Sequence, residues 1–164
     1  MTNNFAAFEV TTPTDREIVM TRGFDAPRAL VFEAWTKAEH VKHWWDPSGT
    51  PLAICEIDLR PNGTFRWIHS GAGGAEHPFT GVYHEISAPE RLVFTVRTNQ
   101  ASQSIATLLF REDKGGTILT ITIQCESMEE RDAMLRMGIH TGTAQTLKNL
   151  AEYLLNNKTL GRRL

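Results

Sequence analysis

The sequence predicts an α+β fold: a curved seven-stranded antiparallel sheet around a long C-terminal helix, with two short helices after the first strand. Six of the strands follow one another through tight turns in the middle of the chain, which is typical of an antiparallel meander. The end of the chain carries an apolar stripe at helical spacing. One amphipathic helix cannot cover both faces of such a sheet. The sheet must therefore curl around it and leave space for a small molecule.

The N-terminal part predicts one strand and two short helices. Polar and apolar residues alternate over residues 16–24, as they do in a half-buried strand. Asp25 can accept hydrogen bonds from the free amides of a first helical turn, and Pro27 tolerates that turn, so a helix is expected to start here. A second helical stretch covers residues 38–45 and stops at the Pro and Gly of residues 46–49.

The middle of the chain predicts six strands, separated by turn sequences rich in Pro, Asn, Asp and Gly. In the last of these strands, Leu119, Ile121 and Ile123 alternate with polar residues, so one face is expected to be buried and the other solvated. The six segments are residues 52–59, 64–69, 79–86, 92–98, 104–111 and 117–125.

The C-terminal part predicts a helix from Ser127 to about Leu155. Ser127 and Glu130 have the spacing of a capping box, which marks a helix start. Gly138 and Gly142 interrupt the apolar stripe, and Gly138 is expected to mark either a kink or the true start of the long helix.

Composition narrows the classes of function. The 164 residues are 41% hydrophobic and 22% charged with a net charge of −2, so there is no basic excess that would bind nucleic acid. No apolar run reaches the length of a membrane span, and residues 1–10 do not resemble a secretory signal. Cys55 and Cys125 are too few for a disulfide framework and are expected to be reduced, which makes a cytoplasmic protein the default.

Five blocks of residues together resemble a known family. They are residues 24–36 (FDAPRALVFEAWT), the pair Trp44-Trp45, residues 58–65 (DLRPNGTF), residues 81–86 (GVYHEI) with residues 89–95 (PERLVFT), and residues 116–120 (GTILT). The sequence resembles the START-like (SRPBCC) superfamily and, more narrowly, the family named for the activator of the heat-shock protein 90 ATPase. This resemblance implies a helix-grip (START/Bet v-like) fold with a ligand cavity.

The resemblance also suggests domain bounds, and the sequence departs from the family pattern at two places. It covers residues 15–156, flanked by an N-terminal extension (1–14) and a C-terminal tail (157–164). The sequence has Asp46-Pro47 where the family usually has Gly-Pro, and Gly142-Thr143 where it commonly has Gly-Trp. Loss of that aromatic residue should change the cavity or its mouth, so the identity of the ligand does not carry over.

Aromatic and methionine side chains are the best candidates for a binding site. Aromatic walls offer large apolar contact with few directional demands, and methionine adapts to shape. The alternative is that most of these residues are simply core. The predicted ligand-binding residues are Trp35, Trp44, Trp67, His69, Phe79, Tyr83, Phe94, Met134, Met137, Thr141 and Ala144.

Polar residues of the strands leave catalysis open. If these polar side chains face the concave side of the sheet, they could serve acid–base chemistry on a ligand. If they face the convex side, they are simply solvated. The residues concerned are Glu56, Asp58, Arg66, His69, Tyr83 and His84. His40 and His43 lie three residues apart beside Glu39, but no third ligand is identifiable, so neither a metal nor a cofactor is expected.

Three functions follow in order of preference. The first is binding of a small hydrophobic or aromatic molecule between the sheet and the C-terminal helix. The second is a cyclase- or hydrolase-type enzyme that uses the same cavity. The third is a chaperone-interaction module, implied by the family name, although in the family that role belongs to a domain joined to a second one, which this sequence lacks. A homodimer is also open.

Overall fold

The computed structural model describes residues 7–69, 79–97 and 103–156. Its N-terminal half contains β1 (Glu9–Thr11), β2 (Glu17–Phe24), α1 (Arg28–Thr36), α2 (Ala38–Trp44), β3 (Ile54–Ile57) and β4 (Thr64–Ile68). Its C-terminal half contains β5 (Phe79–Ser87), β6 (Arg91–Arg97), β7 (Ser104–Asp113), β8 (Gly116–Gln124), α3 (Met128–Arg136) and α4 (Ile139–Asn156). The predicted tail, residues 157–164, lies outside the described residues.

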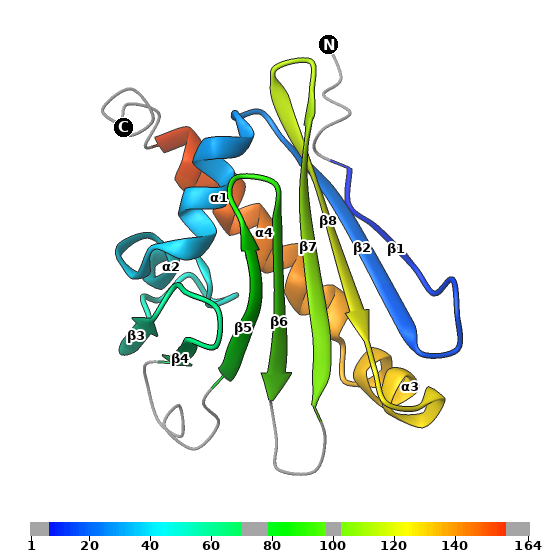
Figure 1. The fold of residues 1–164 in the computed structure, drawn as a ribbon. Helices are drawn as coiled ribbons and strands as arrows, with labels where there is room; N and C mark the ends of the chain where they lie inside the picture. Colours follow the sequence, from blue (N-terminus) through cyan, green and yellow to red (C-terminus); the bar gives the residue numbers. More distant parts are fainter. Residues whose placement is uncertain (1–6, 70–78, 98–102, 157–164) are drawn as a thin grey trace.

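The eight strands in the described residues join one antiparallel sheet in the order β1-β2-β8-β7-β6-β5-β4-β3. The N-terminal strands therefore pair with the last strand of the chain, and Met20 of β2 lies opposite Ile121 of β8. Figure 1 shows α4 crossing one face of this sheet diagonally, with α1 and α2 beside it. We call the face toward α4 the inner face. This arrangement confirms the predicted α+β helix-grip fold.

The eighth strand corrects the predicted count of seven. Glu9–Thr11 lies in the expected N-terminal extension and pairs antiparallel with β2, with Glu9 opposite Thr21. The strand has three residues, and all three side chains are exposed. A strand this short and this exposed produces no buried–solvated alternation, which is the signal on which the prediction relied.

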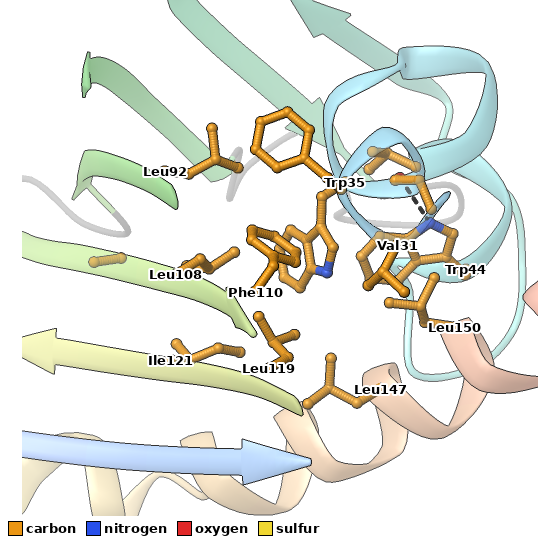
Figure 2. Packing of buried hydrophobic residues seen from close by; sticks show 14 of the residues in the cluster. Val31, Trp35, Trp44, Leu92, Leu108, Phe110, Leu119, Ile121, Leu147 and Leu150 are labelled. Atoms are coloured by element: carbon orange, nitrogen blue, oxygen red, sulfur yellow. Dashed lines mark hydrogen bonds between the residues drawn. The ribbon is translucent and has the colours of Figure 1, made fainter. Parts of the chain in front are cut away.

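The core forms where α1, α2 and α4 meet the inner face. Alternate residues of β7, from Ser104 to Phe110, are buried, while Ile105 and Leu109 point to solvent. On α4 the buried side chains are those of Thr146, Leu147, Leu150 and Leu154. Figure 2 shows this packing, to which α1, α2, β7, β8 and α4 contribute Val31, Trp35, Trp44, Leu108, Phe110, Leu119, Leu147 and Leu150.

The first helix starts differently from the prediction. Its N-cap is Pro27, in an extended conformation, and no side chain caps it. Asp25 therefore does not have the capping role that the sequence suggested. Instead, the hydroxyl of Thr117 on β8 donates a hydrogen bond of 2.7 Å to the carbonyl oxygen of Ala26, which fixes the chain at this point.

The C-terminal segment is helical but divided at Gly138. Ser127 caps α3 by accepting a 3.1 Å hydrogen bond from the Glu130 amide, as the capping box predicts. Gly138 has φ of 84°, a left-handed conformation that ends a helix and suits glycine. The long helix α4 therefore begins at Ile139, which is one of the two alternatives that the sequence allowed.

Both cysteines are free, as predicted. Cys55 is half-buried on β3 at one edge of the sheet, and Cys125 is buried just beyond β8. Burial raises the pKa of the Cys55 thiol to about 11. In the described parts of the chain, no helix has the length and apolarity needed to cross a bilayer.

Candidate ligand-binding cavity

A cavity of about 400 Å³ lies between the inner face of the sheet and α4. The sheet contributes a mostly apolar floor, because the inward-facing positions of its central strands carry aliphatic side chains. The floor residues are Met20, Val96, Ser104, Ala106, Leu108, Ile121 and Ile123. Met134 of α3 and Ile139 of α4 extend this lining toward the break at Gly138.

Aromatic side chains form one end of the cavity. Trp35 lies in the last turn of α1, Trp45 follows α2, and Phe79 begins β5, so three separate parts of the chain bring these rings together. The Trp45 ring lies 6.0 Å from Trp35 and 4.9 Å from Phe79, centroid to centroid. Phe94 of β6 completes the aromatic lining. Such rings present a large apolar surface of low conformational freedom.

Glycine, threonine and leucine residues of α4 line the cavity on the side opposite the sheet. Gly142, Thr143, Thr146 and Leu147 follow helical spacing along one side of α4. A Cβ built on Gly142 would have no heavy atom within 4 Å, so this turn of the helix leaves open space. The hydroxyl of Thr146 donates a 3.1 Å hydrogen bond to the carbonyl oxygen of Trp45, which ties the aromatic end to α4.

A histidine–aspartate pair adds the main polar feature. His69, just after β4, lines the cavity, and its Nδ1 lies 3.1 Å from Oδ2 of Asp46. Burial alone would raise the pKa of Asp46. Hydrogen bonds from Ser48 and His69 outweigh that effect, so the pKa of this carboxyl lies below its usual value. Asp46 is therefore ionised at neutral pH.

The indole of Trp35 is a second polar feature of the lining. Its side chain is only 5% exposed, and its N–H has no acceptor among the described residues. Figure 2 shows the indole extending from α1 into the space between the sheet and α4. The Trp44 indole contrasts with it, because its N–H donates to the carbonyl oxygen of Ala34 at 3.2 Å.

The other histidine cluster lies between α1, α2 and α4. His40 is buried, with Nδ1 2.6 Å from the Tyr153 hydroxyl and Nε2 3.5 Å from the Glu33 carboxylate. His43 stacks on the Tyr153 ring. These contacts bind α2 to its neighbours. Within the described ranges, no three His, Cys, Asp or Glu side chains come together as a metal site would require.

Residues 25–155 match the family described as activator of Hsp90 ATPase homolog 1-like protein. The match covers most of the chain. The protein belongs to this family. A comparison with curated proteins gives no significant match.

Several solved structures are similar to this protein in fold. A protein of Rhodobacter sphaeroides has a TM-score of 0.84 at 20% identity, covering 92% of this chain and 99% of its own. One from Nitrosomonas europaea reaches 0.81 at 25% identity, covering 90% and 99%. One from Chromobacterium violaceum reaches 0.70 at 27% identity, covering 84% and 96%. These likenesses support the helix-grip fold that the family resemblance implied.

Five of the predicted binding residues line the cavity of this protein. They are Trp35, His69, Phe79, Phe94 and Met134. Whether any of them contacts a ligand stays a prediction.

The other six predicted residues lie off the wall. Trp44, Trp67 and Tyr83 are buried core residues, and burial raises the pKa of the Tyr83 hydroxyl. Met137 is 85% exposed in the connection between α3 and α4. Thr141 is exposed and Ala144 is half-buried on α4, and neither lines the cavity.

The candidate acid–base residues mostly face away from the cavity. Glu56 and Arg66 form an exposed ion pair of 3.7 Å, and His84 is exposed with its ring hydrogen-bonded to Thr95. Asp58 pairs with its exposed neighbour Arg60. Of the six candidates, only His69 lines the cavity, so the solvated interpretation applies to Glu56, Asp58, Arg66 and His84.

Sequence reasoning missed Trp45, Asp46 and several lining residues of α4. Trp45 belongs to the recognised Trp pair, and the structure separates the two roles: Trp44 is core and Trp45 lines the cavity. The two departures from the family pattern also fall here. Asp46-Pro47 provides the partner of His69 and a lining residue, and Gly142-Thr143 lies on the helix side of the cavity.

Proposed function

We propose that the protein binds a small, mainly apolar molecule in the cavity between the sheet and α4. The cavity itself carries this proposal. Its volume of about 400 Å³ falls within the range of small-molecule sites, and its lining is mostly aliphatic and aromatic with a few polar groups. A ring-sized ligand would remove this apolar surface from water, which is the main source of binding free energy in such sites.

The unpaired N–H of Trp35 supports the same proposal. A buried donor without an acceptor costs about 1–3 kcal/mol, because it loses its hydrogen bond to water. Trp35 lines the cavity, and an oxygen atom on a bound molecule would supply the acceptor that is absent among the described residues. The proposed ligand is therefore apolar over most of its surface but not a pure hydrocarbon.

Methionine methyl NMR tests the site directly. With 2-methylnaphthalene as probe, the signals of Met20 and Met134 should shift, because both line the cavity. The signals of Met128 and Met137 should stay, because both side chains are exposed elsewhere. The same titration should raise the melting temperature, since a ligand that binds only the folded state stabilises it.

A pair of leucine variants on α4 supplies the matched control. Gly142→Leu places a side chain in the open space of the cavity and should abolish the methyl shifts. Lys148→Leu adds the same side chain at an exposed position of the same helix and should bind like the wild type. The proposal fails if naphthalene and alkyl probes leave Met20 and Met134 unchanged, or if Gly142→Leu binds normally. The chaperone-interaction function would then take precedence.

An enzyme that uses the same cavity is the second candidate. The observation that favours it is the His69–Asp46 pair on the wall, since a carboxylate-oriented imidazole is a common general base. Turnover of a cavity ligand that is lost in His69→Leu, with binding retained, would establish this function. The cytoplasmic location also stays a prediction, which fractionation of the source cells would test.

A further inference from the structure

The two oxygens of Asp46 have separate partners. Oδ1 accepts hydrogen bonds of 3.0 Å from both the amide and the hydroxyl of Ser48. Oδ2 faces Nδ1 of His69 at 3.1 Å. The side chain of Asp46 is only 13% exposed, whereas that of His69 is 35% exposed. Ser48 therefore fixes the Asp46 carboxylate, and the carboxylate orients the His69 imidazole.

Helix α4 fixes the segment that carries Asp46. The side-chain amide of Asn149 donates a hydrogen bond of 3.0 Å to the carbonyl oxygen of Asp46. Together with the Thr146 bond to Trp45, this attaches residues 45–46 to the helix that forms the cavity wall. The partner of His69 is therefore attached to α4, and α4 holds the imidazole in place at the cavity wall through Asp46.

The pairing determines which ring nitrogen is available. An ionised carboxylate only accepts hydrogen bonds, so the proton of a neutral His69 lies on Nδ1, pointing to Asp46. Nε2 then carries a lone pair. In the described parts of the chain, no group makes a hydrogen bond to Nε2. The cavity therefore has a hydrogen-bond acceptor on a wall that is otherwise largely apolar.

We infer that the cavity selects molecules in which an apolar ring system carries a hydroxyl group, with that hydroxyl donating to Nε2 of His69. The inference rests on the proposed function, because it names the ligand class of the same site. A carboxylate fits less well, because it has no proton to donate to Nε2 and would approach the negative charge of Asp46. A ketone oxygen would accept from the Trp35 N–H but would leave Nε2 of His69 without a donor, since a ketone only accepts.

Two probes of nearly equal shape test the inference, namely 2-naphthol and 2-methylnaphthalene. Their dissociation constants are measured from the Met20 and Met134 methyl shifts, and the ratio of the two constants is the readout. In the wild type, 2-naphthol should bind at least as tightly as 2-methylnaphthalene, because the hydroxyl is paired. An unpaired buried hydroxyl would instead weaken binding about 5- to 160-fold.

Two histidine variants assign the effect. His69→Leu should shift the ratio against 2-naphthol by about 5- to 160-fold, because it leaves the buried hydroxyl without its acceptor. His84→Leu, at an exposed histidine of β5, should leave the ratio unchanged. Because the ratio compares two ligands on one protein, a general loss of stability in His69→Leu does not imitate this result.

The outcomes separate the two proposals. If neither probe binds, the proposed function fails and this inference falls with it. If both bind and the ratio is the same in His69→Leu as in the wild type, the cavity function stands and the hydroxyl assignment is overturned. Tighter binding of 2-naphthoate than of 2-naphthol to the wild type would also overturn it, since it would show that the site prefers an anion.

Discussion

Two glycines four residues apart should respond in opposite ways to substitution by alanine. Gly142 lies in α4, with its amide hydrogen-bonded to the carbonyl oxygen of Gly138 at 2.9 Å. Gly138 has φ of 84°, in the left-handed region that side chains disfavour. Neither glycine has a heavy atom within 4 Å of a built Cβ. Space is therefore equal at the two sites, and only backbone conformation differs.

The magnitudes follow from that difference. Gly142→Ala should stabilise the fold by about 0.5–1 kcal/mol, since glycine within a helix costs that much relative to alanine. Gly138→Ala should destabilise it by about 1 kcal/mol, because the left-handed strain of about 1–2 kcal/mol exceeds the entropy gained in the unfolded chain. The two variants should differ by about 2 kcal/mol, or about 4–8 °C in melting temperature.

Urea and thermal unfolding, followed by tryptophan fluorescence, measure both variants against the wild type. If Gly142→Ala is destabilised, the claim of open space beside Gly142 is refuted, because a methyl group there would meet a neighbour. If Gly138→Ala is stabilised, the claim of a helix break at Gly138 is refuted, because α3 and α4 would form one continuous helix. Either result would also remove the geometric basis of the Gly142→Leu test.

Three further outcomes are expected. Gly81→Ala should destabilise the fold by about 3 kcal/mol or more in urea unfolding, because its Cβ would overlap the Thr95 carbonyl oxygen and the Phe65 ring. Ser127→Ala should cost about 1 kcal/mol, because the Glu130 amide loses its cap, and Ser127→Asn should restore most of it. Cys55 should react with iodoacetamide at pH 8 about 100-fold more slowly than an ordinary thiol, because its pKa is raised to about 11, and the rate should climb as pH approaches that value. A fast reaction at pH 8 would show that the thiol is not buried as described.

The fold was accessible from the sequence because its signals are local. Alternation in β8 and the turn sequences between strands fix element types, and the Ser127–Glu130 spacing fixes the start of α3. The strand Glu9–Thr11 was missed because exposed side chains leave no pattern to read. Its pairing with β2 depends on the tertiary arrangement rather than on its own residues.

The cavity residues on the C-terminal helix were harder to predict, for a geometric reason. Extending one helical phase from Met134 through Met137 places Thr141 and Ala144 on the same face, since 4 and 3 residues are close to one turn. The break at Gly138 resets that phase. In α4 the lining positions are Ile139, Gly142, Thr143, Thr146 and Leu147, which follow i, i+3, i+4, i+7 and i+8 from the new start.

On the strand side, the sequence left open which residues face the cavity. Residues on one strand alternate between the two faces, but parity alone does not say which face is the inner one. The register between β5 and β6 also shifts between Tyr83 and Glu85, so alternation counted through this irregularity gives the wrong face beyond it. The Trp44-Trp45 pair shows a similar limit: the two neighbours at the end of α2 point in different directions, one into the core and one into the cavity.

Stability and ligand binding make opposite demands on one turn of α4. A larger residue at Gly142 would raise helix propensity and fill space that the fold leaves open, and both effects would favour the folded state. Thr143 and Thr146 likewise place short side chains where longer apolar ones would pack against the floor of the cavity. A chain selected for stability alone has no reason to keep this turn small. If Gly142→Leu is more stable than the wild type and no longer binds the probe, the small residues of α4 are explained by the ligand rather than by the fold.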